Sequence, residues 1–182
     1  MPRLRYNAAT TLDGFIASPD GSTDWIIEDP AVDFNTLYAE FDTFLMGRKT
    51  YEAMMHYAAQ SGIDALAKRN VVVVSCEMKS ADYPAITIVN NGYLNLIKEM
   101  KEGSGRDIWL MGGGQLAKAL LDAGLLDTVE MAVMPVIIGD GIKMIAGASE
   151  EGNYPWKLKL RNVDALKSGI LMCKHDVIKI QT

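Results

Sequence analysis

The sequence has little of what marks a secreted, membrane-bound or metal-dependent protein. Among its 182 residues there are two cysteines, Cys76 and Cys173, and two histidines, His56 and His175. Neither pair has the spacing of a CxxC motif or a zinc site, so we expect no metal centre. We expect both cysteines to be small buried side chains in a reducing compartment. No stretch approaches the roughly 18 consecutive apolar residues of a membrane span.

A strong charge is also missing. The formal net charge is −5, and no run of lysine or arginine resembles a nucleic-acid-binding tail. A general affinity for nucleic acid or for an anionic membrane is therefore not expected. The first residues, MPRLRYNAATTLDGFIA, contain no apolar stretch of signal-peptide length. We expect a cytoplasmic protein that acts on a small molecule and binds neither nucleic acid nor membrane.

What is present is the composition of one globular domain. Hydrophobic residues make up 49% of the chain and charged residues 23%, which is an ordinary balance for a globular protein. No repeat, low-complexity tract or proline-rich linker divides the sequence. We therefore expect residues 1–182 to form a single domain with a substantial core.

The apolar pattern predicts strands that alternate with helices. Strands are predicted at 4–9, 43–46, 70–75, 85–89, 107–111, 127–138, 156–166 and 169–180, and helices at 30–41, 47–59, 92–102 and 115–124. Residues 10–25 contain Gly14, Pro19 and Gly21, so we expect a long exposed loop there. The order predicts a three-layer α/β/α domain with a mostly parallel central sheet and an antiparallel C-terminal hairpin. In such sheets, ligands bind beyond the carboxyl ends of the strands.

Three consecutive glycines, Gly112, Gly113 and Gly114, join a predicted strand to a predicted helix. Each costs backbone entropy on folding, and a tight turn needs one or two of them. The third suggests that a ligand comes close to this backbone, although a tightly packed turn is the alternative. The full G-x-G-x-x-G pattern is absent and the motif follows a late strand, which argues against a Rossmann fingerprint.

A second strand-to-helix turn carries two cations, Arg48 and Lys49, directly after Gly47. Cations are unfavourable in the first turn of a helix, because the N-terminal end of the helix dipole is positive. A phosphate bound there would explain them, since it accepts backbone N–H groups and a bidentate arginine. The alternative is that both side chains extend into water.

Five motifs in this order resemble the dihydrofolate reductase-like superfamily: AATTLDGFIA, MGRKTYE, VVVVS, GGGQLAKALL and PVIIGDG. The combination is similar to the branch with the RibD C-terminal domain, the riboflavin-biosynthesis reductase domain, and it covers nearly the whole chain. The resemblance implies the dihydrofolate reductase-like fold, an NADPH cofactor and a homodimer.

The resemblance also implies cofactor contacts at matching positions. It places Ala9 and Ile16 around the nicotinamide, and Ser75 near the adenosine 2′-phosphate. The remaining implied contacts, all to phosphate, are Gly47, Arg48, Lys49 and Thr50 at one helix start and Gly112, Gly113, Gly114, Gln115 and Leu116 at the other. Related sequences often follow the serine with a basic residue, whereas here Cys76 and Glu77 follow it. A carboxylate there would repel a 2′-phosphate, unless Lys79, Arg48 or Lys49 compensates for it, so NADP is favoured over NAD less strongly.

Two acids are candidates for the catalytic group beside the nicotinamide. Asp13 matches a position shared across the superfamily, and Asp33 has a spacing to Leu37 similar to that of the pteridine-binding acid. Both also have ordinary structural interpretations, as a loop tie and as a helix-start acid. Asp140 fits a turn residue better than a catalyst. Six side chains could line an apolar pocket or belong to the core: Trp25, Phe34, Leu37, Met54, Tyr57 and Met111.

The leading hypothesis is an NADPH-dependent reductase of a small heterocyclic substrate, pterin- or pyrimidine-like, or of a carbonyl compound. Met111 stands where the riboflavin branch tends to carry a substrate-binding acid, which argues against a ribosyl-pyrimidine substrate. A second hypothesis is a dinucleotide-binding module without chemistry, acting as a sensor or assembly partner. A third is a nucleotide-processing transferase, but GGGQLAK lacks the G-K-[ST] ending that phosphate transfer typically uses.

Overall fold

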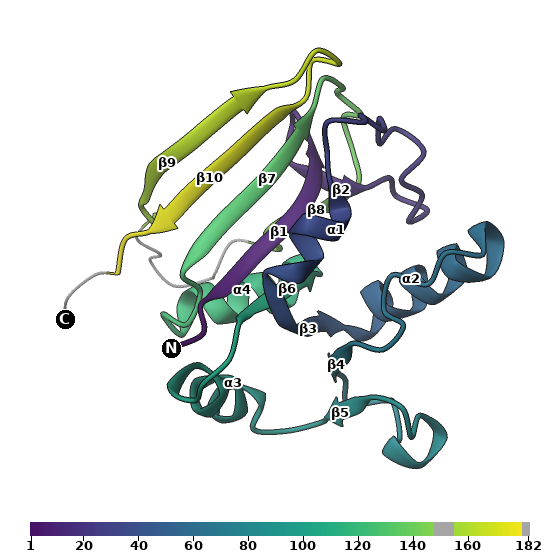
Figure 1. Ribbon diagram of the computed structural model, residues 1–182, viewed down its shortest axis with the longest axis vertical. Coiled ribbons are helices and arrows are strands. Elements are labelled where there is room, and N and C mark those ends of the chain that lie inside the picture. Colours follow the sequence, from purple (N-terminus) through teal and green to yellow (C-terminus); the bar gives the residue numbers. More distant parts are fainter. Residues whose placement is uncertain (148–154, 180–182) are drawn as a thin grey trace.

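An eight-stranded sheet forms the centre of the computed structural model, which describes residues 1–147 and 155–179 (Figure 1). Its order is β5-β4-β3-β6-β1-β7-β10-β9. The strands are β1 (Leu4–Thr11), β3 (Phe41–Gly47), β4 (Asn70–Val74), β5 (Thr87–Val89), β6 (Asp107–Gly112), β7 (Thr128–Met134), β9 (Leu158–Ala165) and β10 (Leu171–Val177). A short antiparallel pair, β2 (Phe15–Ala17) and β8 (Ile142–Lys143), stands apart from this sheet.

The direction of the strands matches the predicted fold class. All pairs from β5 across to β7 are parallel, whereas β10 pairs antiparallel with both β7 and β9. Connections between parallel neighbours need a crossover, which the helices supply. The mostly parallel sheet with a C-terminal antiparallel hairpin at one edge is therefore confirmed.

Helices cover both faces of the sheet because its strands alternate their side chains between two apolar clusters. On one face, α3 (Tyr93–Glu102) and α4 (Gly114–Asp122) pack on Leu45, Leu110 and Val129. On the other face, α1 (Phe34–Ala39) and α2 (Arg48–Ser61) pack on Phe44 and Trp109. A 3₁₀ turn, Ser80–Asp82, follows β4. β9 and β10 extend beyond the helices (Figure 1).

Three local predictions are corrected. Residues 10–25 are not loop throughout, because residues Phe15–Ala17 form β2. The turn before β2 is closed by the N–H of Phe15, which donates to Thr11 Oγ1 at 3.0 Å. The helix predicted at 30–41 is shorter. Asp33 caps its start, and Phe41 already belongs to β3, where burial in the core outweighs the helical spacing. Neither cysteine is fully buried, because Cys76 is exposed where the chain turns away from the sheet after Ser75, and Cys173 is half-buried.

Candidate functional site

The register of the sheet brings three strand ends to one level. Gly47 at the end of β3 pairs with Val74 of β4, and Met46 pairs with Gly112 of β6. The turns after these strands therefore share the carboxyl edge of the sheet, which is where parallel α/β sheets bind ligands. Ser75, Gly112 and the start of α2, far apart in the sequence, meet there.

Two helices begin side by side at this edge, and each has a glycine as its N-cap. Gly47 caps α2 and Gly113 caps α4, and neither supplies a side-chain hydrogen bond to the first turn. A Cβ placed on Gly47 would lie 3.8 Å from the backbone nitrogen of Gly113. The two N-termini thus nearly touch. Unpaired first-turn N–H groups and the positive ends of two helix dipoles make such a place favourable for an anion.

The three consecutive glycines have three different explanations. Gly112 has φ +139°, a conformation that other residues rarely adopt. A Cβ on Gly114 would lie 2.3 Å from the carbonyl oxygen of Lys143, so this glycine makes room for the chain itself. Gly113 has φ −87°, and among the described residues its Cβ would meet only Thr50 Oγ1, at an ordinary 3.7 Å. Packing therefore explains Gly114 and backbone conformation explains Gly112, so the argument that a ligand requires a glycine rests on Gly113. That all three glycines contact phosphate stays a prediction.

Side chains of the first turn of α2 surround the same point. Thr50 Oγ1 would lie 3.3 Å from a Cβ on Gly112, so its hydroxyl faces the glycine turn. Arg48 is partly exposed, and its guanidinium donates to Glu52 at 2.8 and 3.1 Å and to Glu77 at 3.3 Å. These two glutamates raise the pKa of Arg48, with Glu52 the larger cause. The predicted cation pair therefore includes one arginine that already has two carboxylate partners, while Lys49 is exposed.

The cofactor contacts that the family resemblance implies at the start of α4 differ in their burial. Gln115 is exposed, whereas Leu116 is buried in the core between α4 and the sheet. Leu116 can therefore reach a ligand only through its backbone N–H. Ser75 is also buried, and its Oγ accepts hydrogen bonds from the N–H groups of Glu77 and Met78, both at 3.1 Å. Within residues 1–147 and 155–179 the Ser75 hydroxyl only accepts hydrogen bonds, so its proton can be donated to a ligand.

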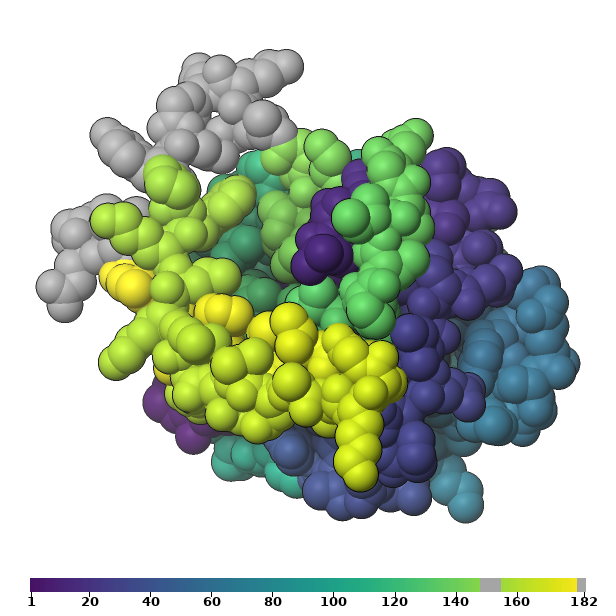
Figure 2. Space-filling model, turned by 90° about the horizontal axis from the view of Figure 1, so that it is seen from above, coloured from purple at the N-terminus to yellow at the C-terminus, as the bar shows by residue number. Residues whose placement is uncertain are grey.

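The loops after β1 and β7 meet beside this edge. Figure 2 shows the purple segment after β1 against the green segment after β7, and Leu12 donates its N–H to the Val136 carbonyl at 2.9 Å. Asp13 accepts the N–H of Gly139 at 2.8 Å, which ties the two loops. Ala9 precedes this tie on β1 and Ile16 follows it on β2, and both are half-buried.

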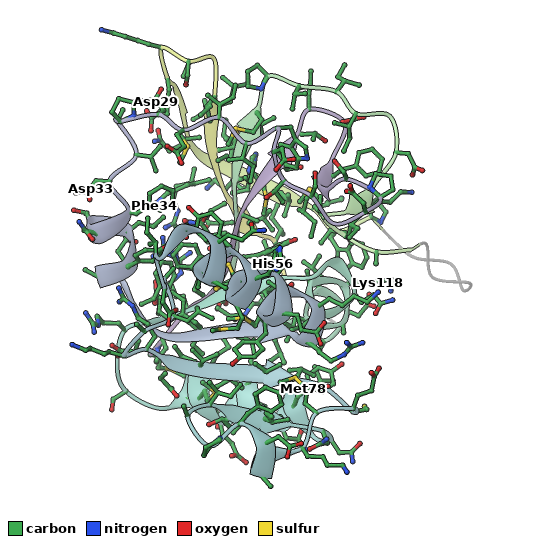
Figure 3. All side chains as sticks on the ribbon, turned by 90° about the vertical axis from the view of Figure 1, so that its right-hand side faces the viewer. Asp29, Asp33, Phe34, His56, Met78 and Lys118 are labelled. Carbon is green, nitrogen blue, oxygen red and sulfur yellow. The ribbon has the colours of Figure 1, made fainter. Side chains whose placement is uncertain are left out.

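The two candidate acids both accept backbone N–H groups. Asp33 lies at the start of α1 (Figure 3), where it accepts the N–H groups of Asn35 and Thr36 at 3.0 and 3.2 Å and the Thr36 hydroxyl at 2.5 Å. Hydrogen bonds, led by the Thr36 side chain, lower the pKa of Asp33. A hydrogen bond from Thr11, with smaller contributions from Gly139 and Ile138, lowers the pKa of Asp13. Both carboxylates are exposed and ionised at neutral pH, which makes neither of them a proton donor without a bound substrate.

The six apolar side chains do not form a single group. Leu37, Met54 and Met111 are partly buried against the cluster beneath α1 and α2. Phe34 and Tyr57 are exposed, at 54% and 49%, and Phe34 lies next to Asp33 (Figure 3). Trp25 is half-buried, with its indole nitrogen buried and without a hydrogen-bond partner in the described residues. Asp140 accepts the N–H of Gly141 at 2.8 Å, as expected of a turn residue.

Sequence reasoning missed a buried ionic cluster. Arg5 on β1 and Glu130 on β7 lie almost fully buried and form two hydrogen bonds, both of 2.8 Å. Arg5 also reaches Glu40 and Asp107, at 2.5 and 3.2 Å. The sequence contained one indication of this cluster, because Arg5 and Glu130 are each the single charged residue of a mostly apolar strand. The pattern gave no indication that the two charges pair.

The described residues form two hollows. The first lies at the opposite edge of the sheet from the glycine turns, whereas the second is lined in part by Met144, whose backbone lies against Gly114. One, of about 330 Å³, is lined by Arg3, Lys98, Lys101 and Asp127 at the amino-terminal edge of the sheet. The other, of about 260 Å³, is mostly apolar and lies over β7 and β10, beside Met131, Cys173 and His175. Across residues 1–147 and 155–179, no cluster of three or more His, Cys, Asp or Glu has a metal-binding arrangement. No described helix is long and apolar enough to cross a membrane.

Comparison with known proteins gives one consistent result. The model of the family described as RibD C-terminal domain matches residues 2–172. An uncharacterized protein of Bacillus subtilis, YyaP, is 29% identical over 177 residues, which cover 93% of this chain and 92% of YyaP.

Two solved structures resemble the fold. A pyrimidine reductase-like protein from Corynebacterium diphtheriae has a TM-score of 0.74 at 14% identity, covering 98% of this chain and 93% of that chain. A diaminohydroxyphosphoribosylaminopyrimidine deaminase/5-amino-6-(5-phosphoribosylamino)uracil reductase from Thermotoga maritima has a TM-score of 0.66 at 16% identity. That alignment covers 97% of this chain and 57% of the longer protein. At these identities the likeness is one of fold.

Proposed function

The chain belongs to the RibD C-terminal domain family, and we propose that it is an NAD(P)H-dependent reductase of a small heterocyclic or carbonyl substrate. The observation that supports this most is the pair of adjoining helix N-termini at Gly47 and Gly113. Both caps lack a side chain, and a Cβ on Gly113 would make an ordinary 3.7 Å contact with Thr50 Oγ1, so the packing of the described residues does not itself require a glycine there. A dinucleotide pyrophosphate has the charge and the size for the gap between the two N-termini.

The chain's own residues have distinct proposed tasks at this site. Backbone N–H groups at the starts of α2 and α4 bind the pyrophosphate, and the Thr50 hydroxyl donates to it. Arg48, Lys49 and Ser75 face the adenosine side, whereas Ala9 and Ile16 border the nicotinamide. The bound nicotinamide supplies the hydride, while the protein fixes its position. Asp13 holds the loop over the site, and Asp33, next to Phe34 and one turn from Leu37, positions the substrate by its charge.

Titration with NADPH and NADH tests the proposal. We expect both dinucleotides to bind with micromolar dissociation constants, as measured by nicotinamide fluorescence and thermal stabilisation. We also expect consumption of the reduced cofactor with a substrate from a panel of dihydropterins, aminouracils and small carbonyl compounds. Binding without turnover on any substrate would favour the module without chemistry. If neither dinucleotide binds, the proposed function is wrong.

The Asp33→Asn variant distinguishes the helix-capping role of Asp33 from its proposed role in positioning the substrate, in the same assay. Asparagine caps a helix about as well as aspartate, so we expect the variant to fold and to bind the dinucleotide as before. A fall in kcat without a change in cofactor affinity would support the proposed substrate role. An unchanged kcat would leave Asp33 as a helix cap only.

We also propose that the chain forms a homodimer through the apolar face of β9 and β10. Leu158, Leu160, Val163 and Leu171 are each between 38% and 54% exposed and lie on the face that carries the 260 Å³ hollow. Large exposed apolar patches are rare on monomers. A two-fold interface places such a patch against itself, so a second copy is a suitable partner. We expect a dimer in sedimentation equilibrium and a monomer for Leu160→Lys, whereas a monomeric wild type would contradict this proposal.

A further inference from the structure

The guanidinium of Arg48 is shared between two carboxylates that come from different elements. Glu52 lies one turn along α2 and accepts both hydrogen bonds of Nη1. Glu77 lies in the turn after β4, 29 positions away, and accepts from Nη2 at 3.3 Å. One cation therefore faces two anions at the point where α2 begins. An incoming phosphate must compete with both of them for Arg48.

The fold fixes Glu77 at this place. Gly47 and Val74 pair across β3 and β4, so the turn after β4 lies level with the start of α2. Ser75 Oγ accepts the N–H groups of Glu77 and Met78, which holds the turn in one conformation. The Glu77 carboxylate thus stands beside both residues that the proposed function assigns to the adenosine side, Arg48 and Ser75.

We propose, on the basis of the proposed function, that Glu77 is a specificity-determining residue that disfavours the 2′-phosphate and makes NADH a cofactor comparable to NADPH. A phosphate dianion beside this carboxylate is repelled, and it loses part of its attraction to Arg48. A free ribose 2′-hydroxyl can instead donate a hydrogen bond to the carboxylate, as acidic residues accept it in NAD sites. Arg48 therefore favours NADPH, whereas Glu77 favours NADH.

Glu52 makes the inference testable by a single substitution. It holds Nη1 of Arg48 in place with hydrogen bonds of 2.8 and 3.1 Å. When Glu77 is replaced by glutamine, Glu52 keeps the guanidinium oriented, and a neutral amide oxygen competes with a phosphate for Nη2 less strongly than the carboxylate does. Since the Glu77 side chain is 73% exposed, the Glu77→Gln variant keeps the fold and the volume of the site.

The experiment measures the dissociation constants of NADPH and NADH for wild type, Glu77→Gln and Arg48→Ala. We expect comparable constants for wild type, about tenfold tighter NADPH binding for Glu77→Gln, and NADH binding that is unchanged or weaker. Arg48→Ala is expected to weaken NADPH more than NADH. The gain in Glu77→Gln is expected to shrink at high salt, because the charges involved are exposed. Glu99→Gln, on exposed α3 surface, removes the same charge elsewhere.

The outcomes separate this inference from the proposed function. If neither nucleotide binds wild type, both are wrong. If both bind and the ratio of their constants changes less than threefold in Glu77→Gln, Glu77 does not determine specificity, although the reductase proposal stands. An equal shift in Glu99→Gln would assign the effect to net charge and would also overturn the inference. Wild type that binds NADPH at least tenfold tighter than NADH would contradict it directly.

Discussion

Gly113→Ala is expected to weaken dinucleotide binding by about 10- to 100-fold without loss of the fold. The added methyl group fits the protein itself, since φ is −87° and the nearest atom, Thr50 Oγ1, would be 3.7 Å away. It would project into the gap between the two helix N-termini and hold the pyrophosphate away from backbone N–H donors. Each charge-assisted hydrogen bond lost there costs about 1.5–3 kcal/mol, which corresponds to the expected change in affinity. Fluorescence titration with NADPH measures it.

Two further variants make this result specific. Gly113→Val carries a larger side chain into the same gap and should abolish binding. Gly103→Ala is the matched control, because Gly103 also lies at a helix end with a negative φ and an ordinary 3.4 Å contact, but it ends α3. Thermal unfolding should show that all three variants fold. Wild-type affinity in folded Gly113→Val would exclude the glycine turn as a phosphate site.

Arg5→Met is expected to destabilise the protein by about 3–5 kcal/mol, because the buried Glu130 carboxylate loses its bidentate partner. It keeps only the Thr128 hydroxyl at 2.9 Å and the half-exposed Lys174 ammonium at 3.5 Å. The side chains of Arg5 and Glu130 are 7% and 6% exposed and share two hydrogen bonds. Glu40 and Asp107, the other partners of Arg5, are more exposed and can be hydrated after its loss. For a chain of this length, the unfolding temperature should fall by on the order of 10 °C, as measured by circular dichroism.

The double variant Arg5→Met/Glu130→Leu distinguishes the effect of an unpaired buried charge from the effect of lost packing. Removing both charges leaves no uncompensated ion, so the double variant should be several kcal/mol more stable than Arg5→Met. Chemical denaturation of the wild type and the two variants measures the difference. A double variant no more stable than Arg5→Met would mean that packing, such as the contact of Arg5 with the Phe41 ring at 4.5 Å, causes the loss.

The buried Arg5–Glu130 pair also predicts that the folding stability falls as the pH is lowered. Burial alone would raise the pKa of Glu130, but the hydrogen bonds and charge of Arg5 outweigh it and hold this pKa below the ordinary 4.5. A lowered folded-state pKa stabilises the protein above the unfolded value and loses that contribution as the pH falls. Wild type should therefore lose more stability below pH 4.5 than the double variant does.

The candidate site was only partly predictable. The glycine turn, the Gly47–Thr50 turn and Ser75 were found as separate segments, and the strand register brings them to one edge. The reason for each glycine was not accessible, because it depends on atoms distant in sequence, such as the Lys143 carbonyl beside Gly114. The pairing of Arg48 with Glu77 was likewise hidden, since 29 positions separate the two residues.

The sequence by itself determined the order of the four helices and of the eight strands in the central sheet, the mostly parallel sheet with its antiparallel hairpin, and the family, but not the short pair β2 and β8. Those features follow from local periodicity and short motifs, which are present in the sequence whatever its tertiary contacts are. The tertiary structure decided where α1 begins and ends, which glycine leaves room for a ligand, and which charges pair. Burial and contact decide such features, and they arise only when segments far apart in the chain come together. Phe41 is an example, since core packing in β3 outweighs its helical spacing.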